Sequence, residues 1–495
     1  HENTRLAFPN FTTIIVINIM KAKVSLKEQK EAFVTGHNGT TSLEILVVCL
    51  SAPISLACYQ AVERLVRPRR RSTLAILLEA LLVWFPMVLC QTNYLYPYGV
   101  MIMILQIVVV VAVMMTVGQA SASQQHSNRS NTTPTAAAAI SSPSQRLEYL
   151  TAYRSSILYL TFIAILAVDF HVFPRRFCKT EIAGFGLMDV GAASFCYSAG
   201  LVSPKARGKP TSWNKLIETL PLIALGCIRI WTNRELEYQE HVSEYGIHWN
   251  FFFTMGILAL IPPIVPGKTP SWVLPVSILG VYQGALSLGG LQDFIVHAPR
   301  RCPATLGASI LCSIMAANRE GILGCLGYLS LYFMGECVGH QYLWKPQRLQ
   351  LQQEQQGLGS LLQLSLFLWL IMGILHWGLN IPISRRSTNA AFCLWAAAHN
   401  TLLLSCLQYT ITTRVPLVWE TVNKYGLLMF LIANLLTGLV NLTIPTLEMP
   451  DPMALAIVSG YICVVGMASL LLDTLWVRFV PSKHSSTHDT MKKSQ

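Results

Sequence analysis

Apolar runs long enough to cross a lipid bilayer recur along the sequence and constrain its fold more than any other feature. A helix that spans the hydrocarbon core needs about 20 mostly apolar residues. Thirteen such runs lie near residues 43–61, 73–90, 98–118, 153–170, 182–201, 216–231, 247–265, 271–290, 321–340, 359–377, 389–410, 425–446 and 453–476. Only 12% of the residues are charged, against about 25% in soluble proteins. We therefore expect an all-α polytopic membrane protein with about 13 transmembrane helices in one bundle.

The distribution of basic residues predicts how these helices are oriented. The net charge is +12, which in a soluble protein would suggest nucleic-acid binding, but membrane proteins concentrate Lys and Arg in their cytosolic loops. If the amino terminus is lumenal, the cytosolic segments hold 21 Lys and Arg, and the lumenal loops beyond the amino-terminal arm hold 9. We therefore expect a lumenal amino terminus, a cytosolic carboxyl terminus and no nucleic-acid partner.

The polar segments divide the chain into an arm, a membrane domain and a tail. We expect residues 1–42 to form a lumenal arm, of which residues 1–26 have no assigned role. Residues 43–476 form the predicted transmembrane domain and residues 477–495 a cytosolic tail. Within the domain, residues 119–145 are rich in Ser, Thr, Gln and Ala without an apolar period, which is typical of a flexible cytosolic linker.

One lumenal segment, ILAVDFHVFPRRFCKTE, gathers charged residues at the end of an apolar helix. Asp169 closes that helix, and an ionisable residue costs roughly 2.5–3.5 kcal/mol at mid-membrane, so such a residue is a functional candidate. The alternative is a surface acid paired with Arg175 or Arg176. Pro174 breaks the helix and lets the segment fold back toward Lys179. A carboxylate and an ammonium at one site could serve proton transfer and charge stabilisation in acyl transfer.

Three further lumenal edges carry polar residues at the start of a helix. These candidate ligand-binding residues are His248 and Asn250, Asn318 and Arg319, and Arg385, Arg386 and Asn389. The alternative roles are an interfacial aromatic-belt position for His248 and contact with lipid headgroups for the arginines. Anchoring arginines would be expected on the cytosolic side, so their shared lumenal location favours a functional role.

The sequence contains no motif of a common soluble enzyme class. It has no G-x-S-x-G elbow, P-loop, H-E-x-x-H or dinucleotide fingerprint, and its cysteines lack metal-site spacing, so we expect no metal. The residues alone leave two functions open. One is an enzyme that acts on a phospholipid at the lumenal face, and the other is a multi-span lipid or anion transporter without acyl-transfer chemistry.

Several longer motifs resemble one family, the inositol acyltransferases of glycosylphosphatidylinositol (GPI) anchor synthesis, known as PIG-W in animals. The motifs are KEAF...NGTT, ILAVDF..FPRRF.KTE, YQEH..EYG.HWNFFFT, NREG, RR..N.AFC.W and N..TGL.NL, in this order across about 410 residues. The resemblance implies an enzyme of the endoplasmic-reticulum membrane that moves a fatty acyl chain, usually palmitoyl. The implied donor is acyl-CoA as co-substrate, the implied acceptor is the inositol 2-hydroxyl of glucosaminyl-phosphatidylinositol, and no cofactor is implied.

The resemblance also assigns roles to individual residues. Asp169 and Lys179 stand where the family has its proposed catalytic pair. We expect Asp169 to take or relay the proton of the inositol hydroxyl, and Lys179 to orient Asp169 or stabilise the developing oxyanion. Direct transfer needs no Ser or Cys nucleophile, although Cys178 keeps a covalent route open. We further expect the acceptor's phosphate to be bound by at least one of Arg175, Arg176, Arg319, Arg385 and Arg386, since a guanidinium fork fits phosphate oxygens.

Overall fold

The structure of the protein, a computed structural model, is helical throughout the residues that it describes. These are residues 26–127, 147–210, 215–236, 242–267, 269–302, 310–344, 360–411 and 413–479. The only extended pairing among them is an isolated bridge between Thr40 and Phe185. Residues 1–25 of the predicted arm, residues 128–145 of the predicted linker and residues 480–495 of the predicted tail lie outside the described residues.

Nine helices within the described residues are long and apolar enough to cross a membrane. They are α3 (Ser42–Val66), Thr73–Cys90 (α4, η1 and α5), the Tyr98–Thr116 part of α6 (Tyr98–Ser127), α7 (Glu148–Ala167), Ile310–Leu343 (α14 and η5), Leu361–Gly378 (α16 and η6), α17 (Ala390–Thr410), α19 (Gly426–Thr443) and α20 (Asp451–Phe479). A tenth arises if α12 (Val273–Leu288) and α13 (Leu291–His297), which meet at a 71° bend, form one span. The all-helical prediction is confirmed, and length and composition support nine or ten spans.

Shorter helices occupy the remaining predicted segments. α8 (Leu187–Leu201), α9 (Lys215–Leu236) and α11 (Phe251–Leu260) lie within or overlap three of the thirteen apolar runs. Each of the thirteen runs therefore contains helix. Outside these runs lie α2 (Leu26–Val34), α10 (Val242–Tyr245) and the amphipathic α18 (Leu417–Lys424), which begins after Pro416.

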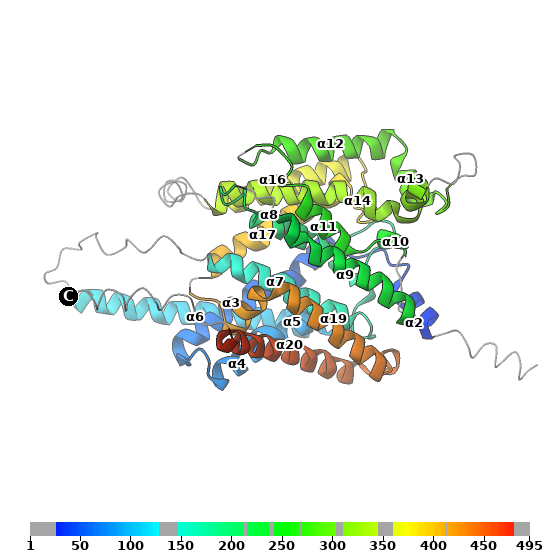
Figure 1. Ribbon diagram of the computed structural model, residues 1–495. Coiled ribbons are helices and arrows are strands. Elements are labelled where there is room, and N and C mark those ends of the chain that lie inside the picture. Colours follow the sequence, from blue (N-terminus) through cyan, green and yellow to red (C-terminus); the bar gives the residue numbers. More distant parts are fainter. Residues whose placement is uncertain are drawn as a thin grey trace, which may run out of the picture.

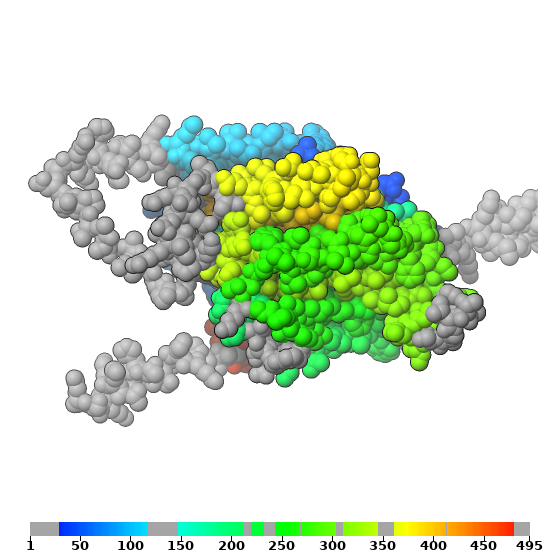
Figure 2. Space-filling view, turned by 90° about the horizontal axis from the view of Figure 1, so that it is seen from above, coloured from blue at the N-terminus to red at the C-terminus, as the bar shows by residue number. Residues whose placement is uncertain are grey.

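The core of the bundle forms around α17, whose sequence AAFCLWAAAHN is rich in small residues. α17 packs against α3, α7, α8, α14 and α16 and is buried over most of its length. The outer helices instead expose large apolar side chains such as Leu105 on α6 and Val281 on α12. Figure 2 shows α6 in cyan, α16 in yellow and α12 in green on one side of the molecule. An apolar exterior of this kind is expected where helices face lipid.

Glycines allow α8 and α14 to approach each other closely. A Cβ atom at Gly200 of α8 would lie 2.0 Å from the carbonyl oxygen of Tyr332, and one at Gly335 of α14 would lie 2.3 Å from that of Tyr197. Both positions therefore require glycine. Association of membrane helices depends on such close van der Waals packing, because lipid provides no hydrophobic driving force between them.

The two ends of the described chain lie at opposite ends of the bundle. Figure 1 shows α2, α10 and α13 at one end and the last turns of α20 at the other. The carboxyl end of α7 also lies at the α2 end, because Asp169, two residues beyond it, binds Asn441 of α19, which in turn binds Lys30 of α2. The predicted site residues that follow α7 are therefore gathered near the amino-terminal helix.

Candidate active site

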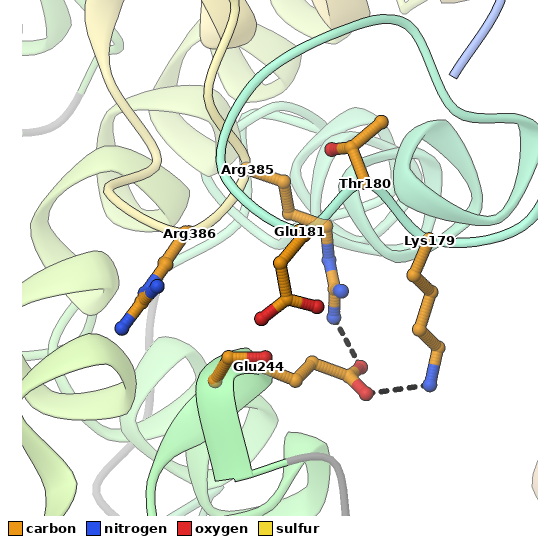
Figure 3. A pocket seen from close by; sticks show the side chains of 7 residues that line it. Lys179, Thr180, Glu181, Glu244, Arg385 and Arg386 are labelled. Carbon is orange, nitrogen blue, oxygen red and sulfur yellow. Dashed lines mark hydrogen bonds and ion pairs between the residues drawn. The ribbon is translucent and has the colours of Figure 1, made fainter. Parts of the chain in front are cut away.

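Three segments that are distant in sequence form a small polar pocket at the α2 end of the bundle. The loop after α7 contributes Lys179, Thr180 and Glu181, the short helix α10 contributes Ser243 and Glu244, and the loop before α17 contributes Arg385 and Arg386. Figure 3 shows the side chains of Lys179, Glu181 and Arg385 turned toward Glu244. The structure thus brings together Lys179, Arg385 and Arg386, three of the residues predicted from the sequence.

Glu244 is the carboxylate that connects these segments. It accepts hydrogen bonds from the Lys179 ammonium and from the Arg385 guanidinium. Burial raises the pKa of the Glu244 carboxyl, but the positive charges of Arg385 and Lys179 lower it more and hold it below its ordinary value. Glu244 is therefore ionised, and it fixes Lys179 at the wall of the pocket.

Arg385 lies between two acids, and only 5% of its side chain is exposed. Besides Glu244, it contacts Asp189 of α8, with 3.5 Å between Arg385 Nη1 and Asp189 Oδ1. The other oxygen of Asp189 accepts hydrogen bonds from the Thr180 backbone N–H at 3.0 Å and from the Thr180 hydroxyl at 2.8 Å. This chain of contacts joins α8, α10 and both loops into one charged network.

Asp169 lies just beyond the end of α7 and is 5% exposed. Its Oδ2 accepts a hydrogen bond from Asn441 Nδ2 at 2.7 Å, and Asn441 Oδ1 accepts one from Lys30 Nζ at 2.8 Å. Asp169 Oδ1 has no protein partner among the described residues. No ion pair joins Asp169 to Lys179 within that part of the chain, so the structure holds the two predicted catalytic residues by separate partners.

The environment of Asp169 acts on its pKa in two directions. Burial raises the pKa of the carboxyl and is the largest effect, so the pKa of Asp169 lies above its ordinary value. The hydrogen bond from Asn441 lowers the pKa, as do the positive charges of Lys30, Arg175 and Lys179. Asp169 therefore retains more basicity than an exposed carboxylate while nearby cations favour its ionised form.

Neither Arg175 nor Arg176 pairs with Asp169, so the surface ion pair considered from the sequence does not form. Arg175 donates to the carbonyl oxygens of Val168 and Phe170, each at 2.9 Å, and its guanidinium lies 4.0 Å from the ring centre of Phe33 in α2. It thereby holds the turn that carries Asp169. Arg176 instead forms a two-pronged ion pair with Glu44 of α3.

The amino-terminal arm docks on the loop that carries Lys179. Thr40 N–H donates to the Phe185 carbonyl at 2.8 Å, and Glu181 N–H donates to the His37 carbonyl at 3.0 Å. Gly184 has φ +138°, and a Cβ atom there would lie 2.0 Å from the Asn38 carbonyl oxygen. The NGTT motif therefore packs against the loop that carries Lys179.

The predicted asparagines act on the backbone around the site. Asn250 and Asn389 accept backbone N–H groups at the first turns of α11 and α17 and begin these helices. Asn318 interrupts α14 with φ −128°, and its Oδ1 accepts the backbone N–H of His248 at 2.8 Å. The His248 side chain is exposed. These residues shape the neighbourhood of the pocket and do not line it.

The other predicted arginines contact a second buried acid, Glu320. Arg386 donates to Glu320 at 3.2 Å, and Arg300 holds the same carboxylate with hydrogen bonds of 2.9 and 2.7 Å. Arg319 Nε donates to the Ile295 carbonyl at 2.9 Å. The Nε groups of Arg385 and Arg386 are buried without a hydrogen-bond partner in the described part of the protein.

The residues of these networks that were missed from the sequence include Asp189, Glu244, Asn441 and Lys30. Asp189 lies in the fifth predicted apolar segment, so the argument that selected Asp169 applies to it as well. Glu244, Asn441 and Lys30 lie within the motifs that carry the family resemblance. Their motif positions were a signal, but nothing in the sequence indicated their partners.

Comparison with known proteins identifies relatives that match most of the chain. The sequence profile of the GWT1 family matches residues 26–472. The chain is 32% identical to GPI-anchored wall transfer protein 1 of Aspergillus oryzae, with 91% of this chain and 98% of that protein covered. It is 34% identical to the Yarrowia lipolytica protein of the same name, over 67% and 74% of the two chains. Glucosaminyl-phosphatidylinositol-acyltransferase PIGW of Bos taurus is 29% identical, with 88% and 96% covered.

Replacing Arg385 by Met should destabilise the protein strongly. Asp189 then remains buried without its cationic partner, and Glu244 loses one of its two cationic partners. Breaking a buried pair in this way typically costs about 3–5 kcal/mol. Arg176→Met is the matched control, since the Arg176 side chain is 44% exposed and exposed pairs contribute about 0–1 kcal/mol. The measurement is the thermal midpoint of each purified variant in detergent. Equal midpoints for the two variants would contradict a central role for Arg385.

Proposed function

The chain belongs to the GWT1 family, which acylates the inositol of glucosaminyl-phosphatidylinositol in GPI-anchor biosynthesis, and from this membership we propose its donor, its site and its mechanism. The protein is a multi-pass membrane O-acyltransferase homologue. The match of residues 26–472 carries this conclusion, because it includes every residue of the pocket and of the Asp169 network. The proposed donor is palmitoyl-CoA, and the proposed catalytic pair is Asp169 and Lys179. This function replaces the transporter alternative.

The proposed mechanism transfers the acyl chain directly. The inositol 2-hydroxyl oxygen attacks the thioester carbonyl carbon while Asp169 Oδ1, which has no partner among the residues that the structure describes, takes the hydroxyl proton. The Lys179 ammonium moves from Glu244 toward the carbonyl oxygen and stabilises its developing negative charge. The carbon–sulfur bond then breaks, coenzyme A leaves as its thiolate, and Asp169 returns the proton to that thiolate.

A covalent route through Cys178 receives little support from the structure. The thiol is buried, and burial raises its pKa to about 11. At neutral pH the residue is therefore almost entirely protonated, whereas the thiolate is the nucleophilic form. Direct attack by the inositol hydroxyl requires no such intermediate.

Among the five candidate arginines, Arg385 and Arg386 are best suited to the acceptor's phosphodiester. Both line the pocket beside Lys179, and both have a buried Nε donor without a partner in the described residues. Arg175 and Arg319 donate to backbone carbonyls, and Arg176 pairs with Glu44. We therefore assign phosphate binding to Arg385 and Arg386, and assign the positioning of the surrounding helices to Asn250, Asn318 and Asn389.

The proposed location is the endoplasmic-reticulum membrane, with thirteen crossings and the site at its lumenal end. Nine long helices together with α8, α9, α11 and the bent α12–α13 pair would make thirteen crossings. An odd number agrees with α2 and the end of α20 lying at opposite ends of the bundle (Figure 1). Cys302, two residues after Arg300 in the sequence, forms a disulfide with Cys312, and disulfides form in oxidising compartments such as this lumen.

Asp169→Asn and Lys179→Met should each lower the acylation rate about 10²- to 10⁴-fold, the usual contribution of a general acid or base. The assay supplies glucosaminyl-phosphatidylinositol and labelled palmitoyl-CoA to the purified protein and measures labelled acylated lipid. Asp293→Asn is the control, because Asp293 is exposed on α13 outside the pocket. A folded variant with more than about a tenth of the wild-type rate would falsify its catalytic assignment. A transporter would form no acylated lipid at all.

Asn441→Leu should move the acidic limb of the pH–rate profile to higher pH. The Asn441 amide lowers the pKa of Asp169, so its removal raises that pKa, and a general base is active only above its pKa. Asn434→Leu is the matched control on the same helix, since Asn434 donates to the Phe430 carbonyl of its own helix. The measurement is kcat against pH for both variants. If the limb stays in place or moves to lower pH, Asn441 does not control the ionisation of Asp169.

The proposed orientation predicts opposite protease sensitivity for tags at the two chain ends. In sealed microsomes an amino-terminal tag should be protected and a carboxyl-terminal tag digested, because basic residues such as Arg70, Arg71 and Lys424 lie near the end of α20 and favour the cytosolic side. Detergent should expose both tags. Digestion of the amino-terminal tag before detergent is added would reverse the assignment.

A further inference from the structure

Glu181 is the one charged side chain of the pocket that has no partner within the described residues. Lys179 and Arg385 bind Glu244, and Arg386 binds Glu320. In the part of the chain that the structure describes, the Glu181 carboxylate makes no hydrogen bond or ion pair, and Figure 3 shows it turned into the pocket. The cations of the pocket already have carboxylate partners, so Glu181 is not needed to neutralise them.

The backbone around Glu181 is fixed on both sides, so its position in the pocket is defined. Its own N–H donates to the His37 carbonyl of the amino-terminal arm at 3.0 Å. The preceding Thr180 binds Asp189, and the carbonyl of the following Ile182 accepts the Ser384 hydroxyl at 2.6 Å. The loop therefore holds an unpaired carboxylate two residues from Lys179.

The chemistry of the acceptor provides a partner for this carboxylate. The glucosaminyl group of the acceptor carries a primary amine, which is protonated at neutral pH. The inositol ring to which this group is attached also carries an anionic phosphodiester. A pocket for this molecule therefore needs donors for the phosphate and an acceptor for the ammonium. Arg385 and Arg386 provide the first, but a carboxylate next to them would repel a ligand that carried only a phosphate.

We infer that Glu181 binds the glucosamine ammonium of the acceptor and makes the enzyme select the free amine over its N-acylated form. This assignment rests on the proposed function, since it assumes that the pocket receives glucosaminyl-phosphatidylinositol. An N-acetyl group removes the positive charge and adds bulk, so it leaves the Glu181 carboxylate unpaired. Discrimination is strong when a site contains a polar group that the wrong ligand leaves without a partner.

The test compares two acceptors, glucosaminyl-phosphatidylinositol and N-acetylglucosaminyl-phosphatidylinositol, with the donor held constant. Glu181→Gln should lower kcat/KM for the amine acceptor about 10- to 100-fold, the range expected for a hydrogen bond between charged groups, and leave the acetylated acceptor unchanged. Glu181→Asp should recover part of the loss. If turnover of the acetylated lipid is too slow to measure, its inhibition constant replaces kcat/KM.

Two further variants separate the possible outcomes. Glu448→Gln makes the same charge change at an exposed position outside the pocket and should leave kcat/KM unchanged for both acceptors. Arg386→Lys should weaken the binding of both acceptors alike, because both carry the phosphodiester. The inference is overturned if Glu181→Gln affects both acceptors equally or neither, or if the wild-type enzyme uses them equally well. If the wild type acylates neither lipid, the proposed function itself fails, and the assignment of Glu181 fails with it.

Discussion

The site depends on the burial of Arg385 between Glu244 and Asp189. A buried charge costs several kcal/mol unless an opposite charge and hydrogen bonds compensate it, so none of the three side chains can occupy its position alone. They come from the loop before α17, from α10 and from α8. Correct packing of these segments is therefore coupled, and Lys179 takes its place only when Glu244 is present to accept its hydrogen bond.

The helix packing must be tight for this network to form at all. Asp189 lies on α8, which reaches α14 through the close contacts at Gly200 and Gly335. A side chain at either glycine would displace α8, and Asp189 with it, from the arginine. α14 is kinked at Asn318, two residues before Glu320, which binds Arg386 of the pocket. Small residues in the apolar part of the bundle thus determine the positions of the buried charges at its end.

The sequence predicted the helices well and the partners of the charged residues poorly. Apolar length alone located helix in all thirteen runs, because the bilayer fixes the length of a spanning helix. Asp169 stood out because an acid ended an apolar run. Its partner Asn441 lies 272 positions away, and Glu244 lies 141 positions from Arg385. Such pairs depend on the three-dimensional order of the helices. The backbone-binding role of Arg175 was equally hidden, since a guanidinium can donate to carbonyls or to phosphates.

The separate partners of Asp169 and Lys179 have a chemical consequence. If the two formed a direct ion pair, the ammonium would occupy the carboxylate oxygen that must receive a proton and would lower its basicity. Asn441 instead holds one oxygen of Asp169 with a neutral amide, which orients the carboxylate and leaves the other oxygen open. The Lys179 ammonium instead donates its hydrogen bond to Glu244. The fold thus supplies a base and a cation that act on different atoms of the reacting groups without neutralising each other.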